Sequence, residues 1–250
     1  MAPADGEREA GLTTPTAADV RRRLDRVYAQ GHVAAEDGSP VALHPHALEQ
    51  ADAREIGALA VSEQVGATLE VGLGLGMGTL TLCAALLEVG RPEARHVVVE
   101  GRPQDFGAAG TRTVRDAGVG RLVEQVDEES QLALPRMVVE GRRFDLALVD
   151  GDHRFEGVFL DLCFADRLVR PRGLVIVDDL WFPPVRLAVS YAERNLGWEL
   201  LPQALTRAFR WRRPRNVPGR RLRGAGDIAV LRRPLERPDI RDWERFVPFT

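Results

Sequence analysis

Carboxylates follow two apolar runs that have the length of buried strands. Asp150 comes directly after Leu146–Val149. Asp178 and Asp179 come directly after Leu174–Val177. The carboxyl ends of parallel strands meet at one edge of a sheet, so these acids are expected to lie close together. Carboxylates brought together repel unless a cation or protons compensate, and oxygen ligands of this kind suit a hard divalent ion, most simply Mg²⁺.

The sequence therefore predicts a metal site made of Asp150, Asp178 and Asp179. The alternative is that one of these acids caps a helix and another pairs with an Arg. Asp152 in particular is expected to cap the helix that follows it.

His153 stands three residues after Asp150. Its imidazole is neutral and basic near pH 7, so it is the candidate general base for a proton that leaves a substrate hydroxyl. A purely structural role for this histidine stays open. Trp181 and Phe182 follow the second acidic pair and are candidates for the wall of a substrate pocket, or for the core.

A glycine-rich turn lies between a strand-like run and an apolar helical pattern. Glycine allows positive φ and a close approach of a ligand to the main chain. The dinucleotide-binding fingerprint is not met, because Met77 and Thr79 occupy the two possible places of its third glycine. The residues of the turn are one acid and three evenly spaced glycines: Glu70, Gly72, Gly74 and Gly76.

This E-x-G-x-G-x-G spacing resembles motif I of the class I S-adenosylmethionine-dependent methyltransferases. The resemblance implies that Glu70 lies near the methionine portion of the cofactor, above the three glycines. It implies that Glu100, at the end of the next strand, accepts hydrogen bonds from the two ribose hydroxyls. It places Ser130 beside the adenine, where the same hydroxyl could also cap a helix, and it includes Asp150 among the cofactor residues. Which neighbouring acid (Asp127, Glu128 or Glu129) faces the cofactor stays undecided.

A larger combination is more specific. The stretch Val149–His153 together with Arg172–Asp179 resembles the metal-dependent macrocin O-methyltransferase type, and its paired acids resemble the metal sites of catechol-type O-methyltransferases. The resemblance covers about residues 68–184. One departure is Arg172-Gly173, where the family commonly has Gly-Gly. The implied activity is Mg²⁺-assisted methylation of a hydroxyl on a small polar acceptor, a sugar or polyol of natural-product assembly.

Strand-like and helical patterns alternate along the chain. This alternation predicts an α/β fold, a doubly wound and mostly parallel sheet of seven strands with an antiparallel last strand. Expected strands are 69–72, 96–100, 122–126, 146–149, 174–177, 198–201 and 227–231. Expected helices are 17–30, 47–65, 79–89, 102–117, 131–140, 156–168 and 185–196, with a loop over 31–45.

The domain division places N-terminal helices in residues 1–60, as a cap over the site or a dimer arm. Residues 61–250 form the cofactor-binding domain. An Arg-rich loop, 206–226, is either a solvated loop or a lid for an anionic group such as a nucleotide diphosphate or a phosphopantetheine arm. An anionic or carrier-linked acceptor and a homo-oligomer are therefore left open.

Composition excludes several classes. The net charge of −3 gives no general reason to expect binding to nucleic acid or membrane, and no apolar run approaches the length of a membrane span. Cys83 and Cys163 are expected to be buried free thiols, and a cytoplasmic location follows. The functional alternatives are a metal-independent N- or O-methyltransferase acting on an aromatic metabolite, and a non-catalytic S-adenosylmethionine-binding module.

Overall fold

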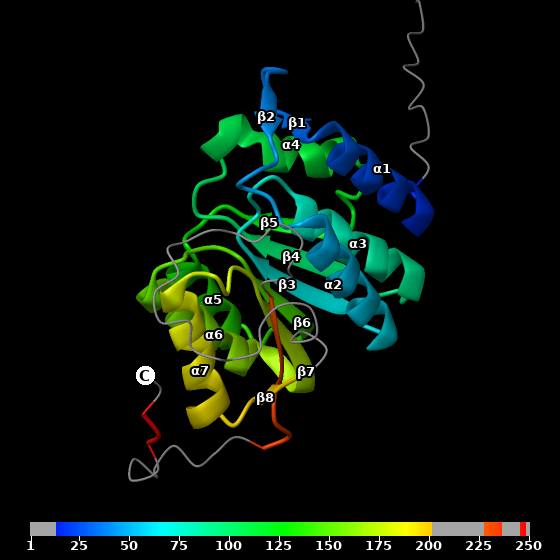
Figure 1. Ribbon diagram of the computed structural model, residues 1–250. Coiled ribbons are helices and arrows are strands. Elements are labelled where there is room, and N and C mark those ends of the chain that lie inside the picture. The colour runs from blue at the N-terminus through cyan, green and yellow to red at the C-terminus, as the bar shows by residue number, and fades with distance from the viewer. Residues whose placement is uncertain (1–13, 202–227, 237–245, 249–250) are drawn as a thin grey trace, which may run out of the picture.

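The computed structural model describes residues 14–201, 228–236 and 246–248. Within them a seven-stranded sheet has the order β5-β4-β3-β6-β7-β9-β8 (Figure 1). The strands β3 to β7 are parallel, and β9 is antiparallel to both of its neighbours, which confirms the predicted fold class. The strands are β3 (Ala67–Val71), β4 (Arg95–Val99), β5 (Val123–Val126), β6 (Phe144–Val149), β7 (Val169–Val177), β8 (Glu199–Leu200) and β9 (Ala229–Arg232).

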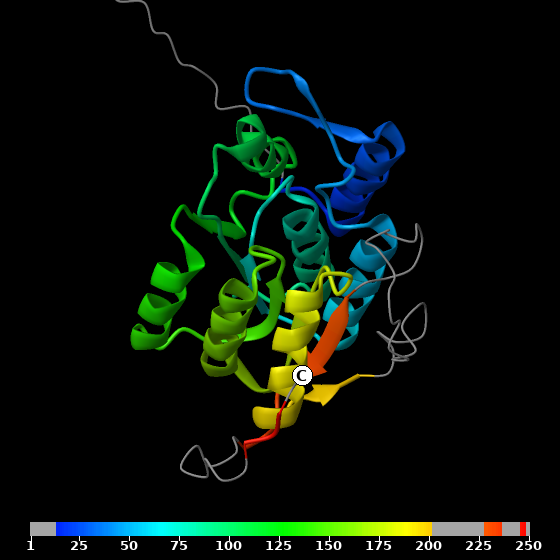
Figure 2. The same ribbon diagram turned by 60° about the vertical axis from the view of Figure 1, so that its left-hand side comes forward.

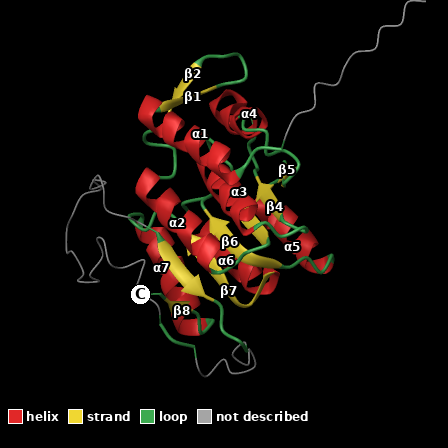
Figure 3. Ribbon diagram, turned by 90° about the vertical axis from the view of Figure 1, so that its right-hand side faces the viewer, coloured by secondary structure: helices red, strands yellow, loops and turns green. Residues whose placement is uncertain are grey.

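Helices cover both faces of the sheet. One face carries α1 (Ala17–Gln30), α2 (Gln50–Ser62) and α3 (Met77–Val89), a layer that Figure 3 views from outside. The other carries α5 (Ser130–Val139), α6 (Phe155–Leu168) and α7 (Pro183–Asn195), which lie side by side in Figure 2. Central strands are therefore apolar on both faces, which is why they read as continuous runs of Val, Leu and Ile.

The two helix layers enclose two hydrophobic cores. Side chains alternate along each strand, so Leu146 and Leu148 of β6 pack toward α1–α3, whereas Ala147 and Val149 pack toward α5–α7. The same alternation places Leu69 of β3 in the second core. The residue between Leu69 and Val71 must therefore face the opposite layer, α1–α3.

The first helix begins and ends as the sequence predicts. Thr16 and Asp19 form a capping box at the start of α1, and Gly31 ends the helix with φ 74°. Val20, Leu24 and Val27 form its buried face. Neither cysteine forms a disulfide in the described part of the chain; Cys83 is buried, whereas Cys163 is half-buried. No helix in the described part of the chain has the length and apolar character needed to cross a membrane.

Three expectations about local structure are wrong. The predicted loop 31–45 contains an antiparallel hairpin, β1 (His32–Ala34) and β2 (Pro40–Ala42). The predicted helix 47–65 is the shorter α2. The predicted helix 102–117 is broken into a 3₁₀ turn, η1 (Asp105–Ala108), and α4 (Ala109–Asp116).

The break before α4 has a local cause. Phe106, Gly107 and Ala108 all have positive φ, so the chain cannot continue as one right-handed helix. The β1–β2 hairpin packs against this turn, and the N–H of Glu36 donates to the carbonyl of Gly107 at 2.8 Å. The predicted Arg-rich loop 206–226 lies outside the described residues.

Candidate active site

A cavity of about 720 Å³ opens at the carboxyl ends of the parallel strands. This is the edge at which doubly wound sheets bind ligands. Its walls come from the turns after β3, β4, β5, β6 and β7, and from the segment before α2. Among the lining residues are Gly72, Gly74, Glu100, Ser130, Asp150, His153, Asp178 and Asp179, so the structure brings eight predicted site residues together.

The glycine turn forms the floor of this cavity. Gly72 has φ 94°, and a Cβ at this position would lie 2.2 Å from the carbonyl oxygen of Asp150. Glycine therefore lets the ends of β3 and β6 approach each other. Gly76, also at positive φ, is the N-cap of α3 and packs against Gly110 of α4, outside the cavity lining.

Glu100 ties the turn after β4 to the glycine turn. Its Oε2 accepts hydrogen bonds from the N–H of Leu73 at 2.9 Å and from the N–H of Gly74 at 3.3 Å. Its Oε1 accepts one from the N–H of Arg102 at 2.8 Å. The main chain thus fixes a half-buried carboxylate at the cavity surface, with lone pairs left for ligand hydroxyls.

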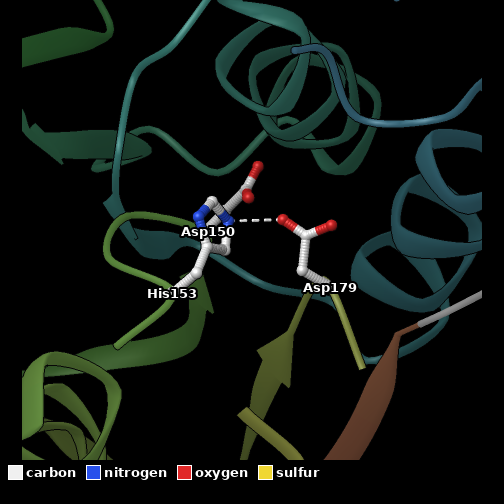
Figure 4. Close-up of side chains that lie close together, drawn as sticks. All are labelled: Asp150, His153 and Asp179. Carbon is white, nitrogen blue, oxygen red and sulfur yellow. Dashed lines mark ion pairs between the residues drawn. The ribbon is translucent and has the colours of Figure 1, made fainter. Parts of the chain in front are cut away.

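The ends of β6 and β7 bring Asp150, His153 and Asp179 together (Figure 4). One ligand atom of each residue lies within 4.8 Å of the others. The Nε2 of His153 is 2.5 Å from the Oδ2 of Asp179, and its ring lies 4.8 Å from the ring of Phe182. The site therefore contains two carboxylates and one imidazole close enough together to bind the same ion or substrate group.

Asp179 is held on both sides of its carboxylate. Trp181 donates from Nε1 to Oδ1 at 2.6 Å, opposite the oxygen that faces His153. The backbone of Asp179 has φ 62°, and its N–H donates to the Oδ1 of Asp178 at 2.8 Å. Asp178 lines the cavity but is outside the three-residue cluster, so the structure places His153, and not Asp178, with the other two predicted ligands.

Residues 69–180 match the family model described as a methyltransferase domain. The matched span contains the glycine turn, Glu100 and the cluster of Asp150, His153 and Asp179. The chain therefore contains a methyltransferase domain, on the class I methyltransferase fold.

The methyltransferase shares its fold with solved structures of low sequence identity. The O-methyltransferase TomG from Streptomyces achromogenes, involved in tomaymycin synthesis and solved with SAM, matches with a TM-score of 0.61 and 18% identity, over 90% of this chain and 93% of that one. An O-methyltransferase from Bacillus cereus in complex with SAH matches with a TM-score of 0.59 and 15% identity, over 89% and 93%. Cofactor-bound Rv0187 from MTB matches with a TM-score of 0.58 and 19% identity, over 91% and 93%. No protein of curated function matches the methyltransferase in sequence.

Glu70 of the methyltransferase does not line the cavity, contrary to the role that the motif implies. Its carboxylate is 1% exposed, accepts a hydrogen bond from the hydroxyl of Thr79 at 2.5 Å and lies 2.9 Å from the Nε2 of His96. The reason is strand parity: Leu69 and Val71 face α5–α7, so Glu70 between them faces α3. It lies against Gly78, in the first turn of that helix.

The turn after β5 also differs in detail. The N-cap of α5 is Glu129 and no side chain caps the helix, so the expected capping role of Ser130 is wrong. Ser130 is the first helical residue, and its hydroxyl interacts with the buried Asp161. Among the three neighbouring acids, Glu129 is the one that lines the cavity of the methyltransferase.

Two acids near this turn have shifted pKa values. Asp152 does not cap α6; it pairs with Arg154 at 2.7 Å, and this contact lowers the pKa of its carboxyl. Asp161 is 1% exposed on α6. Burial raises the pKa of Asp161 to about 7; the Ser130 hydroxyl opposes the shift and the charge of Asp152 adds to it.

His46 and Phe106 line the cavity of the methyltransferase, and the sequence predicts neither of them as a site residue. His46 belongs to the segment before α2, and Phe106 to the broken helix after β4. Neither stands at a strand end or in a motif, so the sequence offers no local signal for them. Their position at the cavity depends on how the N-terminal segment packs against it, which no local sequence pattern encodes.

Proposed function

We propose that this methyltransferase transfers a methyl group to a hydroxyl oxygen of a small polar acceptor, a sugar or polyol of natural-product biosynthesis. The observation that carries the proposal is the cluster of Asp150, His153 and Asp179 in the same cavity as the glycine turn. Two of the structures that share the fold are named O-methyltransferases, one of them involved in tomaymycin synthesis. S-adenosylmethionine supplies the electrophilic methyl group.

Different residues of the cavity lining bind different parts of the cofactor. Glu100 accepts hydrogen bonds from the ribose hydroxyls, because its carboxylate is already fixed by three main-chain amides. Gly72 and Gly74 lie beneath the methionine portion, where a side chain would exclude it. Ser130 and Glu129 border the adenine.

The cluster fits a divalent cation. Asp150 and Asp179 supply carboxylate oxygens, and the Trp181 indole fixes the second oxygen of Asp179, as outer partners of metal ligands commonly do. Asp178 is kept as a third candidate ligand, although its Oδ1 is bonded to the main chain of Asp179. A bound Mg²⁺ would lower the pKa of an acceptor hydroxyl and orient it.

His153 takes the proton that the acceptor hydroxyl loses. Its Nε2 faces Asp179, so in the neutral imidazole this nitrogen carries the hydrogen and Nδ1 is the basic atom. An imidazole oriented by a carboxylate needs no rearrangement when it becomes charged, because the carboxylate stabilises the imidazolium. Transfer then depends on alignment of the hydroxyl oxygen with the methyl group.

The charges of the lining residues favour an uncharged acceptor over an anionic one. Both arginines among the described lining residues are already paired: Arg102 with Asp105 at 3.3 Å, and Arg154 with Asp152 at 2.7 Å. An anionic group entering this part of the cavity would meet carboxylates and find no unpaired guanidinium among these described residues. A polyhydroxylated neutral molecule instead meets hydrogen-bond acceptors.

A metal-independent methyltransferase is the second candidate. It is favoured by the direct contact between His153 and Asp179, which orients a general base without an ion. In that case Asp150 has only a structural role, and an aromatic hydroxyl or amine is an equally suitable acceptor.

The test is a methyl-transfer assay with S-adenosylmethionine and a panel of acceptors: monosaccharides, myo-inositol, catechol and aniline. S-adenosylhomocysteine and the methylated product are measured together, with EDTA and with Mg²⁺ restored. The proposal expects a methyl ether of a diol, loss with EDTA, recovery with Mg²⁺, and a kcat about 100-fold lower in His153→Gln. His32→Gln, outside the cavity, is the matched control. Activity that survives EDTA selects the second candidate, and methylation of aniline alone contradicts transfer to oxygen.

A further inference from the structure

The rings of His46 and Phe106 face each other at the cavity wall. Their centroids are 4.8 Å apart, and their planes are inclined by 43°. His46 lies outside the span 69–180 that matches the methyltransferase model. The pair therefore joins an N-terminal segment outside the matched domain to the turn that follows the ribose-binding strand.

His46 is presented by a firmly anchored turn. Its N–H donates to the carbonyl of Leu43 at 2.7 Å. Leu43 and Leu48 on either side of it are buried in the core, and the hydroxyl of Tyr28 donates to the carbonyl of Leu48 at 2.9 Å. Ordering both flanks of the turn leaves the imidazole in place above the cavity at little further entropic cost.

Phe106 is held in a conformation that its own side chain disfavours. Its φ is 55°, in the left-handed region where a bulky residue is rare. The hairpin maintains this turn, because Glu36 donates from its N–H to Gly107 and pairs with Arg115 at 2.9 Å. Phe106 is nevertheless 37% exposed, so the strained backbone does not serve to bury this residue in the core. Strain of this kind is concentrated at ligand-binding sites.

The position of the pair indicates which ligand it meets. A Cβ built on Gly74 would lie 3.9 Å from the carbonyl oxygen of His46. Phe106 follows Glu100 by six residues. Between them, the N–H of Arg102 donates a hydrogen bond to the Glu100 carboxylate. His46 and Phe106 thus stand over the Gly74–Glu100 part of the cavity, where the ribose and the methionine carbon chain of the cofactor lie in the proposed arrangement.

We infer that His46 and Phe106 form an aromatic clamp on S-adenosylmethionine and its product, and that the product leaves only when the two rings separate. The rings cover the carbon atoms of the ribose and remove them from water. The inference rests on the proposed placement of the cofactor in this cavity. The N-terminal segment then supplies one ring of the clamp and braces the turn that carries the other.

The test is stopped-flow measurement of S-adenosylhomocysteine dissociation from the full-length protein. His46→Ala and Phe106→Ala each raise the dissociation rate about 10-fold, the effect of losing one aromatic contact. Because either substitution opens the same clamp, the double variant is no more than about twofold faster than the single ones. His32→Ala and Phe159→Ala, matched changes outside the cavity lining, leave the rate unchanged.

Two results would overturn the clamp. Unchanged dissociation in both single variants shows that the rings do not contact the cofactor, and fully additive effects show that they act separately. Failure of the wild-type protein to bind S-adenosylhomocysteine is a different outcome, since it contradicts the placement of the cofactor itself. Thermal unfolding of each variant separates a loss of contact from a loss of fold.

Discussion

His153 and Asp179 meet across the ends of two adjacent strands, with Nε2 2.5 Å from Oδ2. β6 and β7 are neighbours in the sheet, so residues just beyond their ends are brought together whatever lies between them in sequence. Trp181 bonds the second oxygen of the same carboxylate. The orientation of His153 therefore depends on a residue that lies beside the site and holds Asp179 in place.

Trp181→Phe removes the hydrogen bond to Asp179 and keeps an aromatic ring. We expect kcat for methyl transfer to fall about 10-fold, the cost of losing a hydrogen bond to a charged group, with the KM for S-adenosylmethionine unchanged. Trp198→Phe is the matched control, since Trp198 donates to Asp166 in the core at 3.0 Å. It should lower stability and leave kcat unchanged. An unaltered kcat in Trp181→Phe would show that the indole does not position Asp179.

Glu70→Gln separates a structural role from a cofactor-binding one. Glu70 is bonded to Thr79 and His96 and is fully buried, so the variant should lose about 2 kcal/mol in the free energy of unfolding. Its affinity for S-adenosylhomocysteine should stay within about threefold of the wild type, because the carboxylate does not line the cavity. Urea unfolding and calorimetric titration measure the two quantities. A large loss of affinity without loss of stability would restore the role that the motif implies.

Asp161 makes stability depend on pH. Its pKa is raised from 3.8 to about 7 by burial, so the folded state favours the protonated acid. The stability that this provides is complete below about pH 4, is lost as pH rises through 7, and amounts to about 4 kcal/mol. Asp161→Asn should therefore be more stable than the wild type at pH 8 and no more stable at pH 4. The free energy of unfolding is measured for both proteins at both pH values. The same difference between variant and wild type at pH 8 and at pH 4 would contradict this explanation.

Gly72→Ala tests the close approach of the glycine turn to β6. The added Cβ meets the carbonyl of Asp150 at 2.2 Å while φ is 94°, so we expect at least a 30-fold loss of affinity for S-adenosylhomocysteine, about 2 kcal/mol. Gly141→Ala is the control, because Gly141 also has positive φ but has open space around it. It should cost about 1 kcal/mol of stability and no affinity. Equal affinities in the two variants would show that the turn is not part of the binding surface.

The sequence predicts the sheet and its acidic edge because both follow from chain-local patterns. Apolar runs mark the strands, and polar residues at their ends must gather at one edge, which correctly brings Asp150 and Asp179 together. Which acid of a neighbouring pair enters the cluster depends on the backbone conformation just after the strand, where Asp179 has φ 62°, and no residue pattern encodes it. Strand parity in contrast could have placed Glu70 in the core, since its neighbours Leu69 and Val71 face the opposite helix layer.

The missed features depend on contacts between distant segments. The hairpin β1–β2 has strands of three residues and little hydrophobic alternation, so the sequence gives no clear strand pattern for it. In the structure the hairpin packs on α4, a segment far away in the sequence. The break at Phe106 is stabilised by the same hairpin. The position of His46 also depends on contacts between distant segments, because Leu43 and Leu48 anchor its turn in the core.

The most direct measurement is calorimetric titration of S-adenosylhomocysteine into the wild type, Glu100→Gln and the surface control Glu124→Gln. We predict that the wild type and the control bind equally and that Glu100→Gln binds about 30-fold more weakly, because a charged acceptor for the ribose hydroxyls is lost. Wild-type protein that binds no S-adenosylhomocysteine, or a Glu100→Gln variant that binds as tightly as the wild type, would contradict the assignment of this cavity to the methyl donor.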